Sequence, residues 1–353
     1  MGEFKIGDQL VGPDEPTFII AEAGSNHNGD INIAKELIEV AADAGADAVK
    51  FQTFRAEDMY VEQSGEVEYL DDERSIYEII ESMEMPYDWI PELHDYCHKQ
   101  GVQFLSTPFD ERSAAELAEY VSAWKVASYT SSHIPFLEYL AGTDKPIIMS
   151  TGAHSLTEIK QSVTALQDRS VSDLVLLQCV AAYPTPLSEI NTHVIKTFQE
   201  EFNVLTGLSD HTLDPVTAPT TAVALGASVI EKHFTLDNSM EGPDHQFALE
   251  PDELNQMISS IRDTEIALGT TEKRVLDVEN ELYEKARRAI QSTKDIELGE
   301  QFTNTNTDIL RPGEQQTGLA PKHYDTVLGK TASRDIQAGE GITKGDIEED
   351  IKE

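Results

Sequence analysis

Eight short apolar segments, each followed by a stretch with helical periodicity, limit the fold of this chain more than any other feature of its sequence. The segments have the length of buried β-strands and lie at residues 18–24, 48–53, 103–108, 124–128, 146–152, 174–184, 204–211 and 229–235. Several of the amphipathic stretches between them end at glycine, as helices often do. Eight βα units in series, from about residue 18 to about residue 270, predict a (β/α)8 TIM barrel of the α/β class.

Two of these units echo each other. "AGADAVKFQ" and "LGASVIEKH" both run from a helix end through Gly-Ala into a strand, and Lys50 then matches Glu231 while Gln52 matches His233. Side chains two positions apart on a strand share a face. We expect both pairs to point into the barrel mouth, where barrel enzymes hold their active sites.

The sequence pattern of the chain changes after residue 270. A charged segment that reads as a helix is followed by short β-like runs and glycine turns, in which "STKDIELGEQFT" echoes "ASRDIQAGEGIT". The sequence therefore predicts a barrel over residues 1–272, a linker helix over 273–286 and a small β-rich domain with a pseudo-repeat over 287–353.

The charge balance excludes several kinds of partner. Lys and Arg total 26 against 65 Asp and Glu, a formal net charge of −39, which argues against binding to nucleic acid or anionic membranes. The acids are scattered through periodic segments, and this pattern suggests a halophilic protein whose self-repulsion is screened by high salt. Cys97 and Cys179 have no disulfide or zinc spacing, and no apolar stretch has membrane length, so we expect a cytoplasmic protein.

Two histidines at neighbouring strand ends are candidate metal ligands. His211 closes the seventh apolar segment and His233 closes the eighth, and adjacent strands bring such side chains within reach of one divalent ion. Glu231 or Asp210 could add a carboxylate, and the remaining positions would be open, as in a catalytic site. The alternative is that both histidines are hydrogen-bonded structural residues.

A second histidine pair has better spacing but a worse place. His94 and His98 are four residues apart in "LHDYCHKQG", on a helix that precedes the third strand and belongs to the outer ring. We interpret them as a solvated helix face.

Two lysines interrupt otherwise apolar strands. Lys50 and Lys125 are candidates for holding a phosphate or carboxylate, although lysines at strand ends can also snorkel to the surface. Hydroxyl groups lie at the same rim of the predicted barrel, at Thr107, Ser128 and Ser209. Five such groups from four strand segments favour an anion site.

Glu22 is an isolated acid at the end of the first strand, in "AEAGSNHNGD". It is a candidate general acid or base, and the alternative is a buried ion pair with Lys50.

Together these segments resemble the sialic acid synthase family. The resemblance covers nearly the whole chain and rests on "IAEAGSNHNGD", "AVKFQTF", "FLSTPFD", "KVAS", "YPTP", "GLSDHT", "EKHFTLD" and "GPDH" in order, then on an antifreeze-like (SAF) domain carrying "RPG". It implies a transferase of sialic acid biosynthesis, which condenses phosphoenolpyruvate with an N-acylated amino sugar such as N-acetylmannosamine. The product would be a nine-carbon 2-keto-3-deoxy sugar acid, formed together with phosphate.

The resemblance also implies roles for individual residues. Mn²⁺, or Mg²⁺ or Co²⁺ in its place, would be held by His211 and His233 and would polarise the sugar aldehyde. Glu22 and Glu231 would transfer protons or position water and sugar hydroxyls. Phosphoenolpyruvate would be held by Lys50, Thr107, Ser128 and Ser209, with Lys125 and Gln52 nearby.

The sugar and the oligomer complete the implied picture. Asp244 would contact the sugar, Tyr183 would be a further substrate-binding residue, and Arg311 would reach the active site of a partner subunit. The functional unit would then be a domain-exchanged, head-to-tail homodimer.

Two departures from the family pattern leave the substrate open. Ala181 stands where the family usually has a polar residue, and "RPGEQQTGLAP" enlarges the loop after Arg311. The alternatives are a synthase for the 9-phosphate, which takes a phosphorylated amino sugar, another phosphoenolpyruvate-dependent 2-keto-3-deoxy acid synthase, or a noncatalytic carbohydrate-binding protein.

Overall fold

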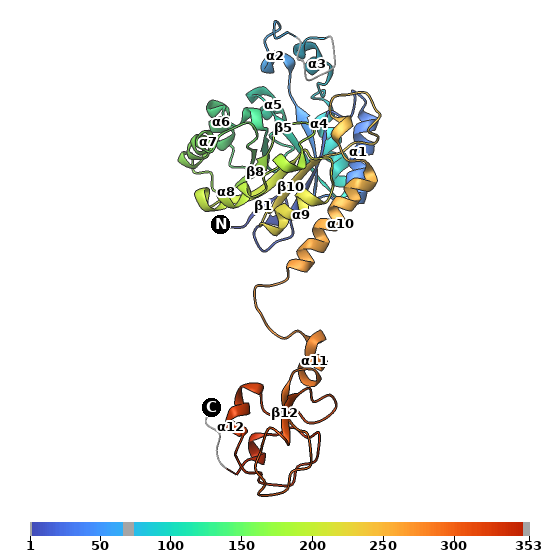
Figure 1. The fold of residues 1–353 in the computed structure, drawn as a ribbon. Coiled ribbons are helices and arrows are strands. Elements are labelled where there is room, and N and C mark those ends of the chain that lie inside the picture. Colours follow the sequence, from blue (N-terminus) through green and yellow to red (C-terminus); the bar gives the residue numbers. More distant parts are fainter. Residues whose placement is uncertain (1, 66–73, 349–353) are drawn as a thin grey trace. The chain divides into compact units, whose positions relative to one another are not determined.

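The computed structural model of the chain describes residues 2–65 and 74–348. The chain forms two compact units, Met1–Gly269 and Thr270–Glu353, which Figure 1 shows coloured along the sequence. None of the helices in the described ranges combines the length and apolar character needed to cross a membrane.

A barrel of parallel strands forms the centre of the first unit. Its strands are β3 (Phe18–Gly24), β4 (Ala48–Thr53), β5 (Gln103–Pro108), β6 (Trp124–Val126), β7 (Ile147–Ser150), β8 (Leu174–Cys179), β9 (Leu205–Asp210) and β10 (Val229–His233). Hydrogen bonds join them in the order β5-β4-β3-β10-β9-β8-β7-β6, and β5 also lies beside β6. The sheet therefore curves into a nearly closed barrel, which confirms the predicted fold class.

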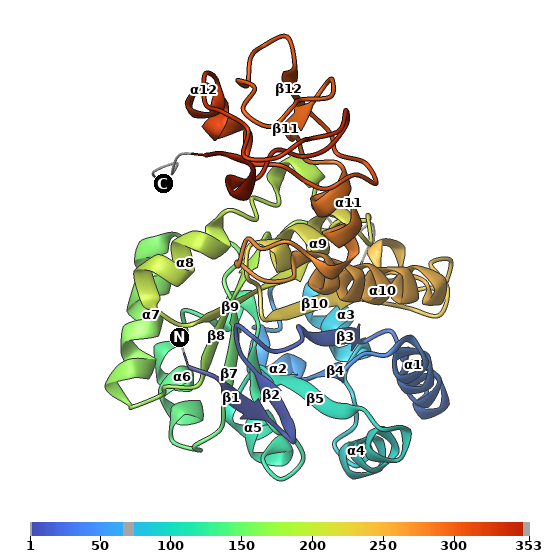
Figure 2. The same cartoon turned by 90° about the horizontal axis from the view of Figure 1, so that it is seen from below.

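Helices surround this barrel on the outside (Figure 2). They are α1 (Ile31–Ala44), α4 (Trp89–Gln100), α5 (Glu111–Leu117), α6 (Ile134–Ala141), α7 (Leu156–Asp168), α8 (Val194–Phe202), α9 (Thr217–Ala224) and α10 (Pro251–Leu268), with the short α2 (Ala56–Met59) and α3 (Ile76–Ser82) between β4 and α4. Local signals set their ends: Asp30 caps the first turn of α1, and Gly45 ends it with a left-handed φ of 85°. Ser155 and Glu158 form a capping box at the start of α7.

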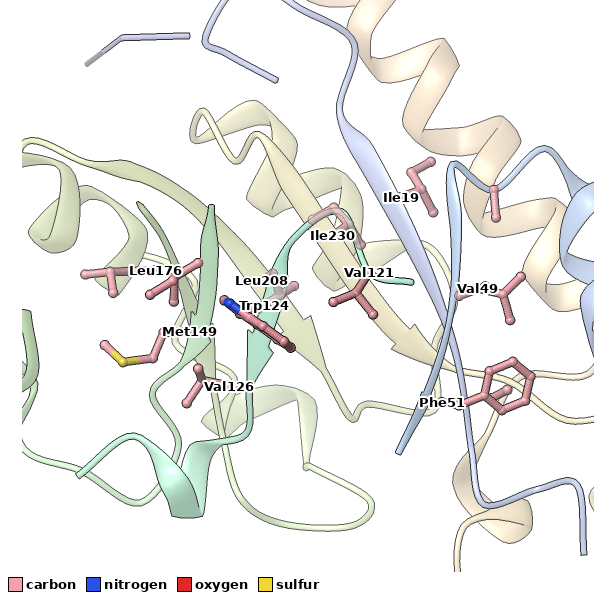
Figure 3. Packing of buried hydrophobic residues seen from close by; sticks show 14 of the residues in the cluster. Ile19, Val49, Phe51, Val121, Trp124, Val126, Met149, Leu176, Leu208 and Ile230 are labelled. Carbon is pink, nitrogen blue, oxygen red and sulfur yellow. The ribbon is translucent and has the colours of Figure 1, made fainter. Parts of the chain in front are cut away.

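The main core lies between the strands and the helices. Outward-facing strand residues such as Val49, Trp124, Met149 and Ile230 are fully buried in this layer, and Figure 3 shows them on separate strands of the barrel. Each such aliphatic side chain contributes roughly 1.5–3 kcal/mol by leaving water. This layer holds the strands in register and so fixes what their inward faces present.

A second core fills the barrel interior at the end where the strands begin. It combines inward strand residues, among them Phe18, Val175 and Val229, with Phe4, Ile6 and Val11 of an amino-terminal hairpin. The hairpin pairs β1 (Phe4–Ile6) with β2 (Gln9–Val11) in antiparallel register. Apolar side chains thus close the end of the barrel where the strands begin, and polar chemistry is left to the other end.

The second unit carries an internal duplication. Its ordered pairings include the antiparallel strands β11 (Ala289–Ser292) and β12 (Thr307–Leu310), and α11 (Asn280–Lys285) precedes them. Asp295 accepts a hydrogen bond from the amide of Ala338 at 2.9 Å, and Asp335 accepts the matching bond from Leu298 at 2.7 Å. The two halves of the sequence echo therefore pair with each other around a small apolar core. That core consists of Ile290, Ile296, Phe302, Val327, Ala332, Ile336, Ile342 and Ile347.

Candidate active site

Strand alternation places a polar layer in the barrel directly above the apolar one. On β3, Phe18 and Ile20 belong to the interior core and Glu22 is the next residue on that face. On β10, Glu231 follows Val229 in the same way. We call the resulting four groups the charged layer, and each is at most 5% exposed: Glu22, Lys50, Lys125 and Glu231.

Lys50 lies at the centre of the charged layer. Its Nζ is 2.7 Å from Oε2 of Glu22 and 3.8 Å from Oε2 of Glu231, and it donates to Oγ1 of Thr107 at 2.9 Å. Gln52 donates to the other oxygen of Glu22 at 2.9 Å. The structure therefore contains the Glu22–Lys50 ion pair, while a role of Glu22 in proton transfer stays a prediction.

Lys125 approaches Glu231 from the opposite wall. Its Nζ is 3.4 Å from Oε1 of Glu231 and donates to Oγ of Ser150 at 2.8 Å. Ser209 donates to the same carboxylate oxygen at 3.0 Å. Ser150 was not singled out from the sequence, although its place at the end of the apolar segment "PIIMS" matches that of Ser209 and could have identified it.

Burial and neighbouring charges shift the pKa values of the charged layer in different directions. Burial raises the pKa of Glu22 to about 7, because its effect exceeds that of the neighbouring Lys50 ammonium. Burial also acts to raise the pKa of Glu231. The ammonium groups of Lys125 and Lys50 lower this pKa by more than burial raises it, so that it lies below its usual range. Burial lowers the pKa of Lys125, whereas carboxylates keep that of Lys50 above its usual value. Glu231 is thus the more acidic of the two carboxyl groups, and Glu22 can gain or lose a proton near neutral pH.

Ser128 lies at the rim beside a required glycine. Its Oγ accepts a hydrogen bond from the amide of Gly152 at 2.9 Å and is 3.5 Å from Sγ of Cys179. A Cβ atom on Gly152 would lie 2.9 Å from that oxygen and 3.2 Å from the amide nitrogen of Ala181. Any larger residue at 152 would therefore displace the hydroxyl or the β8 loop.

The two predicted histidines face each other. The ring centroids of His211 and His233 are 5.5 Å apart. Nδ1 of His211 lies 2.9 Å from the carbonyl oxygen of Val180, which can only accept, so Nδ1 donates, and in the neutral imidazole Nε2 keeps its lone pair. Nδ1 of His233 is buried without a hydrogen-bond partner, at 3.8 Å from Oδ2 of Asp244. Burial and the nearby His211 hold the pKa of His233 well below its usual value, which favours the neutral imidazole.

This donor set fits an open metal site. A carbonyl that fixes the far nitrogen of a ligating histidine is the usual outer-shell contact, and a buried, unpartnered nitrogen calls for a ligand. Within residues 2–65 and 74–348 no cluster of three or more His, Cys, Asp or Glu side chains has metal-binding geometry. The protein therefore offers His211 and His233, and further ligands would come from substrate, water or a moved carboxylate.

An aromatic wall borders the histidine pair. The ring of Phe247 is centred 5.2 Å from His233 and 5.1 Å from Tyr183, and Tyr183 in turn lies 4.2 Å from His211. Asp244 precedes this wall, and burial raises its pKa to about 6. Phe247 was not among the sequence candidates, because a lone aromatic residue in a loop gives no periodic signal.

Within the first unit, His94 and Lys232 lie away from this centre. His94 projects from α4 on the outside of the barrel, where it packs against Phe104 and Tyr120. Lys232 points away from the mouth and forms a buried ion pair with Asp210 at 2.5 Å, which ties β10 to β9. Arg311 belongs to the second unit, where it directly follows β12 and is exposed.

Fold and site together define a class. A (β/α)8 barrel with a lysine–glutamate layer and an imidazole pair at the carboxyl ends of its strands is a barrel enzyme with its active site in the usual place. The particular family follows from comparison with known proteins: the chain belongs to the NeuB family, whose model matches residues 37–273, and residues 287–348 match the SAF domain. The resemblance inferred from the motifs is confirmed.

Individual relatives match over most of their length. The spore coat polysaccharide biosynthesis protein SpsE of Bacillus subtilis is 41% identical over 98% of both chains. The N,N'-diacetyllegionaminic acid synthase of Legionella pneumophila is 38% identical over 91% of this chain and 92% of its own. A solved structure is also similar: the crystal structure of the N-acetylneuraminic acid synthetase of Leptospira borgpetersenii has a TM-score of 0.73 and 32% sequence identity. The match covers 80% of this chain and 95% of the synthetase chain.

Proposed function

We propose that this protein condenses phosphoenolpyruvate with an N-acylated amino sugar to give a nine-carbon 2-keto-3-deoxy sugar acid and phosphate. The single observation that carries the proposal is the charged layer beside the histidine pair: two buried ammonium groups, ringed by hydroxyls, within one barrel mouth. The names of relatives that make diacetyllegionaminic and N-acetylneuraminic acid support this reaction.

In this reaction the two lysines hold the anionic substrate. Lys50 and Lys125 neutralise its phosphate and carboxylate, and the donors that orient these groups are Thr107, Ser128, Ser150 and Ser209. Carbon 3 of phosphoenolpyruvate forms a bond to the aldehyde carbon of the sugar. Water then adds at carbon 2, and the carbon–oxygen bond to phosphate breaks.

Glu22 and Glu231 handle protons and water. Glu22, with its pKa near 7, can deliver or remove a proton at working pH, which is where a general acid or base is most effective. Glu231 stays ionised between the two lysines and positions water or a sugar hydroxyl. A divalent ion such as Mn²⁺, held by His211 and His233, would supply polarisation of the aldehyde.

The acceptor is an unphosphorylated sugar. On the acceptor side of the site Asp244 lies beside the histidine pair, and its carboxylate favours hydroxyl and amide groups over a second phosphate. Tyr183 and Phe247 form the apolar part of that side. The acyl group and the stereochemistry of the sugar are left to experiment.

We also propose that two copies complete each other's site. Large apolar side chains are exposed on the loops at the barrel mouth and on residues 275–283 of the second unit: Tyr129, Tyr183, Leu187, Leu213, Val275, Leu276, Val278, Leu282 and Tyr283. Such surface favours burial against a second copy, which would bring Arg311 to the partner's mouth.

Phosphate release tests the reaction directly. Phosphoenolpyruvate, Mn²⁺ and concentrated KCl are combined with N-acetylmannosamine, with its 6-phosphate, or with the diacetamido hexoses that correspond to legionaminic and pseudaminic acids. We expect release with one unphosphorylated sugar, abolished by a chelator and by His211→Ala but not by the matched control His98→Ala on the exposed face of α4. A folded protein that releases no phosphate with any of these sugars would contradict the proposal.

A further inference from the structure

The segment after β10 carries Asp244 and Phe247 to the histidine pair, and one buried residue ties it down. His245, which begins the short helix η3 (His245–Phe247), is fully buried and uses both ring nitrogens. Nδ1 lies 2.6 Å from Oγ1 of Thr235, and Nε2 lies 3.2 Å from Oδ1 of Asn28, a residue 217 positions earlier. The imidazole therefore links three separate pieces of backbone.

The hydrogen-bond pattern places a proton on Nε2 of His245. The side-chain nitrogen Nδ2 of Asn28 donates to the carbonyl oxygen of Glu241 at 2.9 Å, so Oδ1 of the same side chain faces His245 as an acceptor. Nε2 of His245 must then carry a proton. In the neutral imidazole Nδ1 accepts from the hydroxyl of Thr235, whose oxygen also lies 3.3 Å from the carbonyl oxygen of Asp237. Burial lowers the pKa of His245, which agrees with this neutral tautomer.

The backbone around this linkage is adapted to it. A Cβ atom on Gly242 would lie 2.8 Å from Cδ2 of His245 and 3.3 Å from Oδ1 of Asn28, and Gly242 has a φ of 145°. Asn28 itself adopts a positive φ of 49°, which asparagine tolerates well. Asn238 adds a bond from its side-chain amide to the carbonyl of His245 at 2.6 Å. The segment thus packs closely against Asn28 in the loop that follows β3, and no space is left for a side chain at position 242.

None of these contacts reaches the charged layer, so His245 acts through its neighbours. Asp244, one position away, approaches His233, and Phe247, two positions away, packs on the rings of His233 and Tyr183. We propose that His245 is a positioning residue: its linkage to Asn28 and Thr235 fixes residues 237–248 as the wall that recognises the amino sugar. This inference rests on the proposed function for the identity of the ligand.

Kinetics of matched variants test the proposal. We expect His245→Ala and Asn28→Ala each to raise KM for the amino sugar about tenfold while KM for phosphoenolpyruvate stays within twofold, and the double variant to resemble either single one. Thr235→Val should act in the same direction, because it removes the hydroxyl at nearly constant volume. Thr235→Ser keeps the hydroxyl and should behave as the wild type.

Hydrogen exchange supplies a readout that needs no turnover. Backbone amides of residues 237–248 should exchange at least tenfold faster in His245→Ala, while peptides from β6 and β7 are unchanged. Equal rises in both KM values, strictly additive effects of the single variants, or unchanged exchange would overturn the positioning role. A wild-type protein that is inactive with every sugar would instead refute the proposed function, and the exchange data would still decide whether the linkage holds the segment.

Discussion

Replacing Glu22 by glutamine will stabilise the barrel at alkaline pH while it removes most of the activity. Glutamine keeps the shape of the protonated side chain and an oxygen that can accept from Lys50, which lies 2.7 Å from Glu22. It lacks the negative charge, which is unfavourable at a site that is 1% exposed and already faces the carboxylate of Glu231.

The magnitude follows from the pKa of Glu22, which burial raises from 4.5 to about 7. Each pKa unit corresponds to about 1.4 kcal/mol, so ionised Glu22 destabilises the folded state by about 3 kcal/mol. Between these two pKa values the folded protein binds more protons than the unfolded chain, and wild-type stability falls as the pH rises. The gain from Glu22→Gln is therefore near zero below pH 4.5 and reaches about 3 kcal/mol above pH 7.

Denaturant unfolding at pH 4.5 and pH 8.5 in concentrated KCl measures this difference. Both tryptophans, Trp89 and Trp124, lie in the first unit, so their fluorescence reports barrel unfolding. The exposed Glu116→Gln on α5 serves as the control and should change stability equally at both pH values. Phosphate release by Glu22→Gln should fall by roughly two orders of magnitude or more. A variant less stable than the wild type at pH 8.5, or a pH-independent difference, would refute the reasoning.

Four further outcomes are expected. Lys125→Met should raise KM for phosphoenolpyruvate about a hundredfold with little change for the sugar, as steady-state kinetics would show, because it removes one of two cations from the anion site. Phe247→Ala should have the opposite selectivity, with a larger KM for the sugar alone. Mixing Arg311→Ala with His211→Ala subunits should recover about a quarter of wild-type activity if sites are shared across a dimer, and no recovery would argue against exchange. Thermal unfolding should shift to higher temperature between low and molar KCl, because salt screens the formal charge of −39.

The part of the site that lies on the strands was predictable from the period of two residues in a β-strand. The rule that residues two apart share a strand face places Lys50 with Gln52 and Glu231 with His233, and the hydrogen bond from Gln52 to Glu22 shows that these faces meet inside the barrel. The rule works because eight parallel strands must present their carboxyl ends to one mouth.

Features without such a repeat escaped prediction. The amino-terminal hairpin has strands of only three residues, too short for a recognisable alternation, and yet its Ile6 and Val11 are fully buried in the barrel. The linkage between Asn28 and His245 joins two loops far apart in sequence, and nothing in either loop indicates the other. Loop contacts of this kind depend on tertiary closure, which local patterns do not encode.

The acidic composition and the charged layer act together on the approach of an anion. An anionic substrate approaching a protein of formal charge −39 is repelled over long range, but salt screens that repulsion beyond roughly 3 Å at molar ionic strength. Lys50 and Lys125 are buried within contact distance of carboxylates, where screening by solvent ions is weak. We therefore expect high salt to weaken the unfavourable field of the surface and to leave the attraction of the buried lysines for an anion largely intact. Burying the two lysines would then allow the rest of the chain to be acidic without losing the proposed anion site.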